Sequence, residues 1–456
     1  MRTRYSARWV LPVTADPIAD GAVLVGVDGR IEAVGADDDV PRPADAASVA
    51  LGDAALLPGL VNVHAHPELT ALRGLLEDLP FHDWIPALMR AKRGARLEVD
   101  DFVVSARQGC SEAVRAGITT LGVTEDSGAS LDALIGLGLR GIVFREVFAP
   151  SPQQADAAML ALRKAVDAMR TRETDLVRTG ISPHAPFSVC DELFEKAADF
   201  ARNENLPLAV HVAESEAERL LVVCGTGPFA EALRARGIAT PVRGTSTVDM
   251  LERTGTLGER ALLIHCVDVS GQDIDRIAGA GAAVAHCPIA NARLGHGIAP
   301  VLEMRAAGIT VGMGTDSVAS NNRVDLLEEC RTAQILQRAR QRSPSALPAA
   351  TLLRMATLDG ARALGLDGRI GSLEPGKDAD LCAVCLGDVH ARPVNDPLAA
   401  LFHSARAPDV LLVAVRGRIV FSREREQPIQ DAADAEHLDN VARRLRAALA
   451  PRLVSP

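Results

Sequence analysis

The chain has 456 residues, 48% of them hydrophobic, so it can bury a large core and exceeds the usual size of a single domain. Its formal net charge is −10, and its charged residues are scattered rather than grouped, which argues against nucleic acid and membranes as partners. We find no signal peptide, no apolar run of about 18 residues and no cysteine framework, and therefore expect a soluble cytoplasmic protein.

The first 58 residues have the texture of short strands. The segment "GAVLVGVDGRIEAVG" alternates apolar and polar residues around Asp28-Gly29, which predicts a hairpin. Near the other end, "DVLLVAVRGRIVFS" (409–422) has the same texture. We predict that residues 1–58 and 368–456 form one small β-sandwich domain, closed by a helix in "DAEHLDNVARRLRAALAPRL".

Residues 59–367 have a different rhythm. Eight short apolar runs, from "GLVNVHAH" to "ITVGMGTDS", alternate with amphipathic stretches such as "DELFEKAADFARNEN". Alternating strands and helices are typical of an α/β fold with a parallel sheet. Eight such units predict a (β/α)8 TIM barrel, whose active site lies at the carboxyl ends of the strands.

Chemically reactive residues stand at that end of the apolar runs. Because residues i and i+2 of a strand face the same side, His64 and His66 can bind one ion together. Imidazoles with a carboxylate are ligands of Zn²⁺ and Fe²⁺, and His211 and Asp316 would complete such a set. The residues that end the runs are His64, His66, Arg145, Glu146, His184, His211, Glu214, His265, His286 and Asp316.

The motifs "PGLVNVHAH", "HVAES", "LIHC" and "GTDS", in this order, resemble the amidohydrolase superfamily over nearly the whole chain. The resemblance is to its cytosine-deaminase-like and adenosine-type deaminase branch. It implies that His64, His66, His211 and Asp316 are the metal ligands. Glu214 takes the last position of the family's HxxE motif, and His265 takes its position on the sixth strand.

Some members of this superfamily hold two metals bridged by a carboxylated lysine. The four lysines here are Lys92, Lys164, Lys196 and Lys377, and none ends a predicted barrel strand. We therefore expect one divalent ion, Zn²⁺ first and Fe²⁺ as the alternative.

With one ion, the expected reaction is hydrolytic deamination of a ring carbon. The ion would lower the pKa of its bound water and so supply hydroxide. Asp316 would take the water proton while His265 hydrogen-bonds the developing hydroxide. Glu214 would protonate the ring nitrogen and later pass a proton to the departing ammonia.

For the substrate, "SPHAP", "HCPIANARLGHGIAP" and "GTDSVASNNRVDLLEE" resemble deaminases of adenosine-type nucleosides. The candidates are adenosine, methylthioadenosine, S-adenosylhomocysteine and aminodeoxyfutalosine; "LTALRGLLEDLPFHDW" and "FREVF" favour the last. The resemblance implies that His184 contacts the purine. It also implies that Arg145 or Glu146, with Trp84 or another first-loop residue, meets the sugar or its 5′ substituent.

Several alternatives stay open at this point. The same set of residues at the strand ends could act on guanine, cytosine, a pterin or a chlorinated triazine. A remote alternative is a scaffold protein without catalytic activity. Where the family often has "NMKLASG", this chain has "NARLGHG", so His296 adds an imidazole whose role is open, as is that of His286. Barrels of this family commonly associate, so we expect a homo-oligomer, a dimer or larger.

Overall fold

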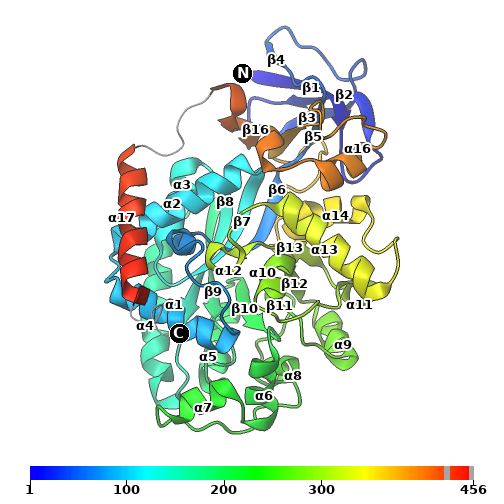
Figure 1. Cartoon of the computed structure of the whole chain (residues 1–456). Helices are drawn as coiled ribbons and strands as arrows, with labels where there is room; N and C mark the ends of the chain where they lie inside the picture. Colours follow the sequence, from blue (N-terminus) through cyan, green and yellow to red (C-terminus); the bar gives the residue numbers. More distant parts are fainter. Residues whose placement is uncertain (426–431, 451–456) are drawn as a thin grey trace.

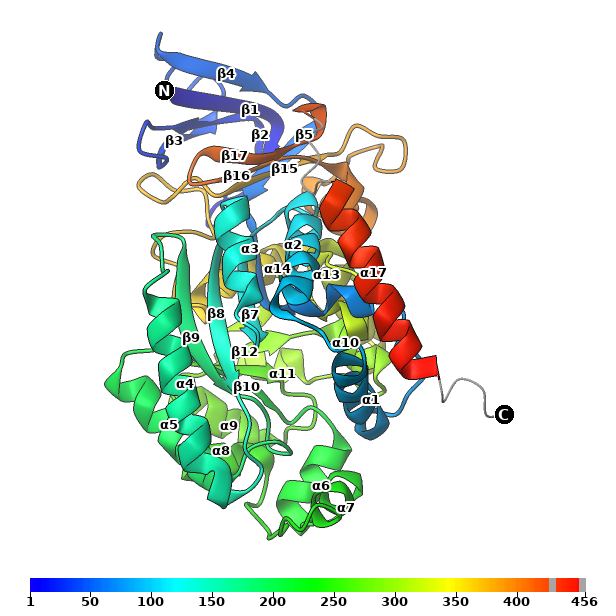
Figure 2. The same ribbon diagram turned by 90° about the vertical axis from the view of Figure 1, so that its left-hand side faces the viewer.

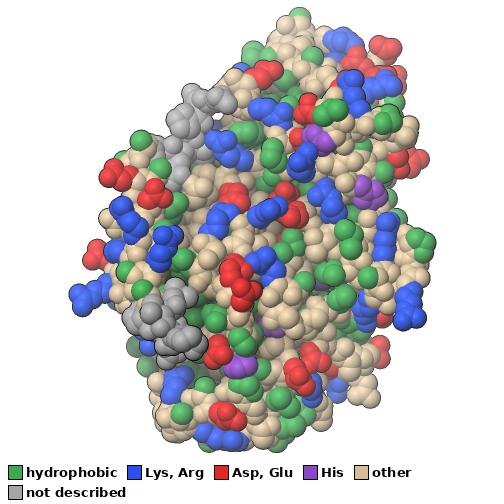
Figure 3. Space-filling model, in the orientation of Figure 1, with side chains coloured by type: hydrophobic (Ala, Val, Ile, Leu, Met, Phe, Trp, Pro, Cys, Tyr) green, Lys and Arg blue, Asp and Glu red, His purple; other side chains and the backbone are tan. Residues whose placement is uncertain are grey.

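The computed structural model of the chain describes residues 1–425 and 432–450. Two sheets organise it: a curled parallel sheet in the middle of the chain, and a second sheet built from both chain ends and lying at one end of the molecule (Figure 1). Figure 3 shows acidic and basic side chains interspersed over one face, as the scattered charge of the sequence predicts. Within the described residues, no helix combines the length and hydropathy needed to cross a bilayer.

The parallel sheet contains the eight predicted apolar runs, with the last run divided in two. β13 pairs with β12, whereas β14 pairs with β6, so the divided strand contacts both the seventh and the first strand. The sheet therefore curls round as in a TIM-like fold, which confirms that part of the prediction. Its strands are β6 (Leu60–His66), β7 (Ile118–Glu125), β8 (Arg140–Val147), β9 (Val177–Pro183), β10 (Leu208–Val212), β11 (Ala261–His265), β12 (Ala283–His286), β13 (Val311–Met313) and β14 (Asp316–Ser317).

Helices alternate with the strands of this sheet, and several of them, among them α4 and α5, cover its outer face (Figure 2). Their starts follow ordinary capping chemistry: the Ser215 hydroxyl accepts the Glu218 N–H at the start of α6, and Ser270 forms a capping box with Asp273. The helices are α2 (Val99–Arg115), α3 (Ala129–Leu137), α4 (Ala155–Arg170), α5 (Asp191–Asn203), α6 (Glu216–Cys224), α7 (Pro228–Arg234), α8 (Thr247–Arg253), α9 (Gly271–Ala280), α10 (Pro288–Arg293), α11 (Val301–Ala306), α12 (Val318–Asn321), α13 (Leu326–Gln341), α14 (Ala349–Ala356) and α15 (Leu358–Ala363).

Apolar side chains fill the inside of the curled sheet. Val61, Ile142, Phe144 and Leu262 are fully or almost fully buried in one cluster there. Because this interior is packed, chemistry is confined to the carboxyl ends of the strands, where the polar residues stand.

The sheet of the chain ends has the order β17-β16-β15-β5-β1-β2-β3, with β4 beside β1. Both predicted hairpins form, β2 with β3 and β16 with β17, and the first turns at Gly29 with φ 80°, which glycine adopts without strain. β15 pairs with β5, so the two chain ends do share one sheet. The strands are β1 (Arg2–Val10), β2 (Ile18–Val25), β3 (Ile31–Ala36), β4 (Ala46–Ala50), β5 (Ala54–Pro58), β15 (Leu381–Cys385), β16 (Val410–Val415) and β17 (Arg418–Ser422).

These strands join in a single hydrogen-bonded sheet. The sandwich arrangement, and the division into 1–58 with 368–456 and 59–367, stay predictions. A short helix, α16 (Pro397–Ala399), lies between β15 and β16.

The predicted closing helix forms as α17 (Ala432–Leu449) and packs beside α1 (Phe81–Gly94) and α2 (Figure 2). Gly94 approaches Ala448 so closely that a Cβ at position 94 would lie 2.8 Å from the alanine methyl. The Asp101 carboxylate of α2 binds His437 at 2.8 Å and also binds Arg444 of α17. The last helix is thus fixed against the helix that follows the first barrel strand.

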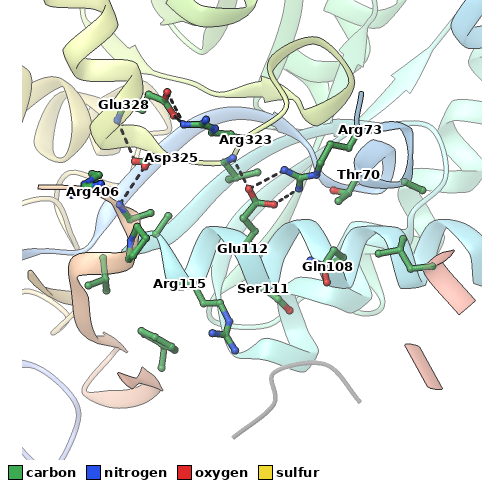
Figure 4. Close-up of a pocket in the computed structure, with 18 of the residues that line it drawn as sticks. Thr70, Arg73, Gln108, Ser111, Glu112, Arg115, Arg323, Asp325, Glu328 and Arg406 are labelled. Atoms are coloured by element: carbon green, nitrogen blue, oxygen red, sulfur yellow. Dashed lines mark hydrogen bonds and ion pairs between the residues drawn. The ribbon is translucent and has the colours of Figure 1, made fainter. Parts of the chain in front are cut away.

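A cavity of about 1160 Å³ lies between α2, the start of α13, the second sheet and α17 (Figure 4). In its wall, Arg73 binds the Glu112 carboxylate and donates to the carbonyl oxygen of Asn322. Glu112 also accepts the Val324 N–H at 3.1 Å. These bonds join the segment after β6 to the segment after β14.

Candidate metal centre and active site

Three imidazoles face one another at the carboxyl ends of β6 and β10. The ring centroids of His64 and His66 are 4.8 Å apart, and that of His211 lies 5.0 Å from His64 and 5.5 Å from His66. The alternation of side chains along β6 places both of its histidines on the same side. All three are buried, so few water molecules compete with them for a ligand.

Asp316 brings a carboxylate to this group from β14. Its Oδ1 lies 3.3 Å from His64 Nε2 and 3.6 Å from His66 Nε2. The Ser320 hydroxyl donates to Oδ2 at 2.8 Å and so fixes which oxygen faces the imidazoles. Asp316 and His265 have φ values of 57° and 76°, a left-handed conformation that is uncommon outside glycine and recurs at functional sites.

The protonation states of the group suit a cation. Burial lowers the pKa of His64 and His66, and burial together with His64 and His265 lowers that of His211 to about 3. Burial alone would raise the pKa of Asp316, but the hydrogen bond and charge of His64, with the other imidazoles, hold it well below its usual value. Neutral imidazoles and an ionised carboxylate are the donors that a divalent metal requires.

Backbone and amide oxygens orient two of the imidazoles. His211 Nδ1 lies 3.0 Å from the carbonyl oxygen of His184, and His265 Nδ1 lies 2.9 Å from the Asn291 Oδ1 atom. Because both oxygens can only accept, Nδ1 carries the proton in each ring. In each ring the other nitrogen, Nε2, then faces the centre.

Glu214 follows β10 and is 4% exposed. Its Oε1 atom lies 3.5 Å from His265 Nε2 and 3.3 Å from His296 Nε2. Burial alone would raise its pKa, but His265 and His296 outweigh burial and bring the pKa below the usual value, so the carboxylate is ionised. Glu218 braces this turn, because its carboxylate accepts the N–H of Ala213 at 2.7 Å.

Of the four expected substrate contacts, His184 and Glu146 lie at the edge of the ring. His184 Nε2 is 4.0 Å from Glu146 Oε1, and its ring centroid is 4.8 Å from that of His211. Arg145 alternates with Glu146 along β8 and so shares the side of Val143, which packs into the outer helix layer. The structure therefore does not bring Arg145 onto the face that carries the ring.

The fourth expected contact, Trp84 of α1, belongs to an aromatic cluster formed with Phe81, Phe187 and Phe229. Phe187 and Phe229 stack at 4.4 Å, and Phe81 lies 6.3 Å from Trp84 and edge-on to His296 at 4.7 Å. Only 3% of the chain is aromatic, so the concentration of four such residues here is notable. The cluster joins segments after β6, β9, β10 and β12, and separations this long hide it from sequence reasoning.

Glu146 has two further buried acids near it, Glu68 and Glu125, and these two were missed in the sequence. Burial raises the pKa of Glu68 and of Glu125, and burial together with Asp126 raises that of Glu146 to about 8. Within the described part of the chain, Glu68 Oε2, Glu146 Oε1 and Trp84 Nε1 are buried without a hydrogen-bond partner. Glu68 stands two positions after His66 and could have been noted in the sequence for that reason. Its burial, however, depends on the fold.

The remaining sequence candidates have simpler positions. Lys92 lies in α1 with its ammonium 3.3 Å from Asp126, and none of the four lysines ends a barrel strand, as the sequence predicts. His286 ends β12, and burial lowers its pKa to about 3. Neither of its ring nitrogens has a hydrogen-bond partner among residues 1–425 and 432–450.

Residues 55–420 match the model of the amidohydrolase family, which covers most of the chain, including the ring of imidazoles. The chain belongs to the amidohydrolase family. The resemblance inferred from its motifs is confirmed, and with it the prediction of a hydrolase that acts on C–N bonds.

Individual relatives of this amidohydrolase span nearly its full length. A 5-methylthioadenosine/S-adenosylhomocysteine deaminase of Moorella thermoacetica is 34% identical over 422 residues, 91% of this chain and 92% of the relative. The structure of an adenosine deaminase from Xanthomonas campestris with bound zinc is 30% identical, covers 98% of both chains and gives a TM-score of 0.86. Zinc-bound atrazine chlorohydrolase of Arthrobacter aurescens is 25% identical over 97% of this chain and 100% of its own, with a TM-score of 0.82.

Proposed function

We propose that this amidohydrolase is a deaminase that hydrolytically releases ammonia from the 6-amino group of an adenosine-type nucleoside. The observation that supports this proposal most directly is the position of Glu214. This carboxylate is buried and ionised, and it lies 3.5 Å from His265 at the edge of the group of imidazoles. A carboxylate there can take a proton from the attacking water and give it to a ring nitrogen while the neighbouring carbon is attacked. The candidate nucleosides are adenosine, methylthioadenosine, S-adenosylhomocysteine and aminodeoxyfutalosine, in line with the full-length relatives.

We propose that His64, His66, His211 and Asp316 hold one divalent ion, Zn²⁺ with Fe²⁺ as the alternative. One potential ligand atom from each of His64, His66 and His211 lies within 4.8 Å of the others, and His64, Asp316 and His265 meet the same criterion. When bound, such an ion lowers the pKa of a water ligand towards neutrality. The zinc in the Xanthomonas structure supports this choice of metal.

The proton transfers fall to three side chains. Asp316 presents Oδ1 to the centre and would take the other proton of the attacking water. His265 carries its proton on Nδ1, so its Nε2 accepts a hydrogen bond from the water and orients it. Glu214, ionised in the free protein, would take one proton of the attacking water and give it to the ring nitrogen. It would then pass the water proton held by Asp316 to the leaving ammonia.

For the rest of the substrate, we propose that His184 contacts the purine, while Glu146 and Trp84 meet the sugar or its 5′ substituent. Glu146 Oε1 and Trp84 Nε1 support this, because each is buried without a hydrogen-bond partner in the described residues. With its pKa near 8, Glu146 is protonated at neutral pH and can donate as well as accept. Arg145 would act on this subsite only through its charge, which lowers the pKa of Glu146.

A second candidate keeps the ring and changes the heterocycle to guanine, cytosine, a pterin or a chlorinated triazine. The similarity to a chlorohydrolase at 25% identity is the reason to include these heterocycles in the test. A scaffold without catalysis has no support, because every expected member of the ring is present and buried. A homo-oligomer and a cytoplasmic location stay predictions.

Ammonia release from zinc-loaded protein tests the proposal. The panel holds the four adenosyl compounds together with guanine, cytosine, a pterin and a chlorotriazine, whose chloride release is also followed. We expect activity on adenosyl compounds that is at least tenfold above every free heterocycle. Turnover of a free heterocycle alone would replace the substrate assignment, and a protein that is inactive on all of them would contradict deamination of this class.

A further inference from the structure

Two imidazoles, not one, face the carboxylate of Glu214. His265 Nε2 lies 3.5 Å from Glu214 Oε1, and His296 Nε2 approaches the same oxygen to 3.3 Å. His296 comes from the loop after α10, and its side chain is 3% exposed, so the contact is sealed from solvent. Two rings converging on one oxygen leave the other oxygen of Glu214 available for a different partner.

One residue anchors both rings. The Asn291 side chain accepts from His265 Nδ1 at 2.9 Å, and its backbone carbonyl accepts the N–H of His296, also at 2.9 Å. Gly295 and Gly297, with φ of 74° and 109°, stand on either side of His296. Side chains rarely adopt these backbone angles, so the glycines allow the loop to turn its imidazole inwards.

The two rings are held in different ways. His265 is fixed by the bond from its Nδ1 to Asn291, and its Nε2 lies 3.5 Å from Glu214 Oε1. His296 Nε2 has no hydrogen-bond partner in residues 1–425 and 432–450, although it is buried. A buried polar atom without a partner is costly, and with a proton on Nε2 a small rotation of the ring would direct it at the carboxylate 3.3 Å away.

We propose that His296 is a positioning residue for deamination: it donates to Oε1 of Glu214 and thereby turns Oε2 towards the ring nitrogen of the substrate. This inference rests on the proposed function. His296 also touches Phe81 edge-on at 4.7 Å, so it connects the carboxylate to the aromatic cluster at the mouth. His296 stands in "LGHG", where this chain differs from the "NMKLASG" pattern.

Two substitutions separate positioning from packing. His296→Phe keeps an aromatic ring against Phe81 and removes the donor, whereas His296→Gln keeps an N–H donor and removes the ring. On the best adenosyl substrate, we expect kcat to fall about tenfold or more in His296→Phe with little change in KM, and to recover partly in His296→Gln. His403→Phe, at an exposed histidine outside the ring, is the matched control and should behave as wild type.

Metal content should stay at the wild-type level in all three variants. A kcat within twofold of wild type for His296→Phe would overturn the inference. A loss of kcat in both His296 variants, with no recovery in His296→Gln, would assign His296 a packing role and also overturn it.

A second readout does not depend on turnover. In protein labelled with ¹⁵N at histidine, the His296 resonances are those lost in His296→Phe. We expect Glu214→Gln to move them and to leave those of His403 unchanged; unmoved His296 resonances would contradict the contact. If the wild-type protein released no ammonia while these resonances moved, the proposed function would fail and the His296–Glu214 contact would stand.

Discussion

Asn62 of β6 and Thr315, which precedes β14, are joined by two hydrogen bonds across the point where the curled sheet closes. The amide Nδ2 donates to Thr315 Oγ1 at 2.8 Å, and Oδ1 accepts the Thr315 N–H at 3.1 Å. Backbone pairing here extends over only two residues of β14. Because His64 and Asp316 flank this contact, its geometry sets that of the candidate metal centre.

Replacing Asn62 should therefore weaken both the fold and the centre. Asn62→Ala removes the amide donor to Thr315 Oγ1 and one of the two acceptors of the Thr315 N–H, whose bond to the His64 carbonyl oxygen remains. The expected cost is therefore about 0.5–1.5 kcal/mol of the free energy of unfolding. We expect a lower Tm and weaker zinc binding, measured by thermal unfolding and by competition with a chelator. Asn203→Ala, at an exposed position of α5, should change neither quantity, and an unchanged zinc affinity in Asn62→Ala would sink the structural link.

Glu214→Gln should retain the metal and lose nearly all turnover. The amide cannot deliver a proton to the ring nitrogen, and general acid catalysis contributes about 10²- to 10⁴-fold to a rate. Glu216→Gln is the matched control, since Glu216 is exposed only two residues away. Steady-state kinetics with metal analysis checks both variants, and wild-type kcat in Glu214→Gln would remove the proton-transfer role.

Removal of the metal should abolish activity and lower the Tm. A ligand that binds only the folded chain adds RT ln(1 + [L]/Kd) to the free energy of unfolding, and that contribution disappears with the ion. Dialysis against a chelator, followed by titration with Zn²⁺ or Fe²⁺, should restore activity at one equivalent per chain. Full activity in the stripped protein, or restoration that needs two equivalents, would contradict a single-ion site.

Glu146 should make the stability of the protein fall as the pH rises from about 4.5 to about 8. Its folded pKa is raised to about 8 by burial and Asp126, so between about 4.5 and 8 the folded chain holds a proton that the unfolded chain has lost. The stabilising contribution is therefore complete below about pH 4.5 and is lost as the pH rises through 8. In Glu146→Gln this dependence is absent.

We accordingly expect the Tm of Glu146→Gln, relative to wild type, to rise between pH 5 and pH 9. The two proteins share every other titrating group, so their difference isolates this carboxyl. Glu192→Gln, an exposed substitution on α5, should show no such trend. A constant difference in Tm across this range would mean that Glu146 titrates normally.

The sequence predicts the eight strands well because each strand is a run of apolar residues that becomes polar at its end. His64, His66 and Asp316 mark two of these ends. Such a change is local and visible in a few residues. The aromatic cluster is different: Phe81 and Phe229 are far apart in the chain, and nothing near either residue signals their contact.

The same limit applies to the polar contacts. Glu68 and Asn291 look like ordinary helix residues in the sequence, and only packing shows that one is buried and that the other holds two histidines. Arg145 is the opposite case, a residue that the sequence singles out and the structure places away from the ring. Its neighbour Glu146 reaches the ring, and the alternation of side chains along the strand turns Arg145 to the other side. His296 stood out as an unusual residue in a recognised motif, but its direction depended on the two glycines beside it.

The helix α17 has a consequence for how the molecule is made. It is synthesised after the whole barrel, yet it packs on α1, whose Phe81 and Trp84 stand at the mouth of the barrel. A nascent chain thus contains all of its candidate ligands, including Asp316, before the helix that supports the entrance. Chains that terminate before α17 would have these residues behind an unsupported entrance.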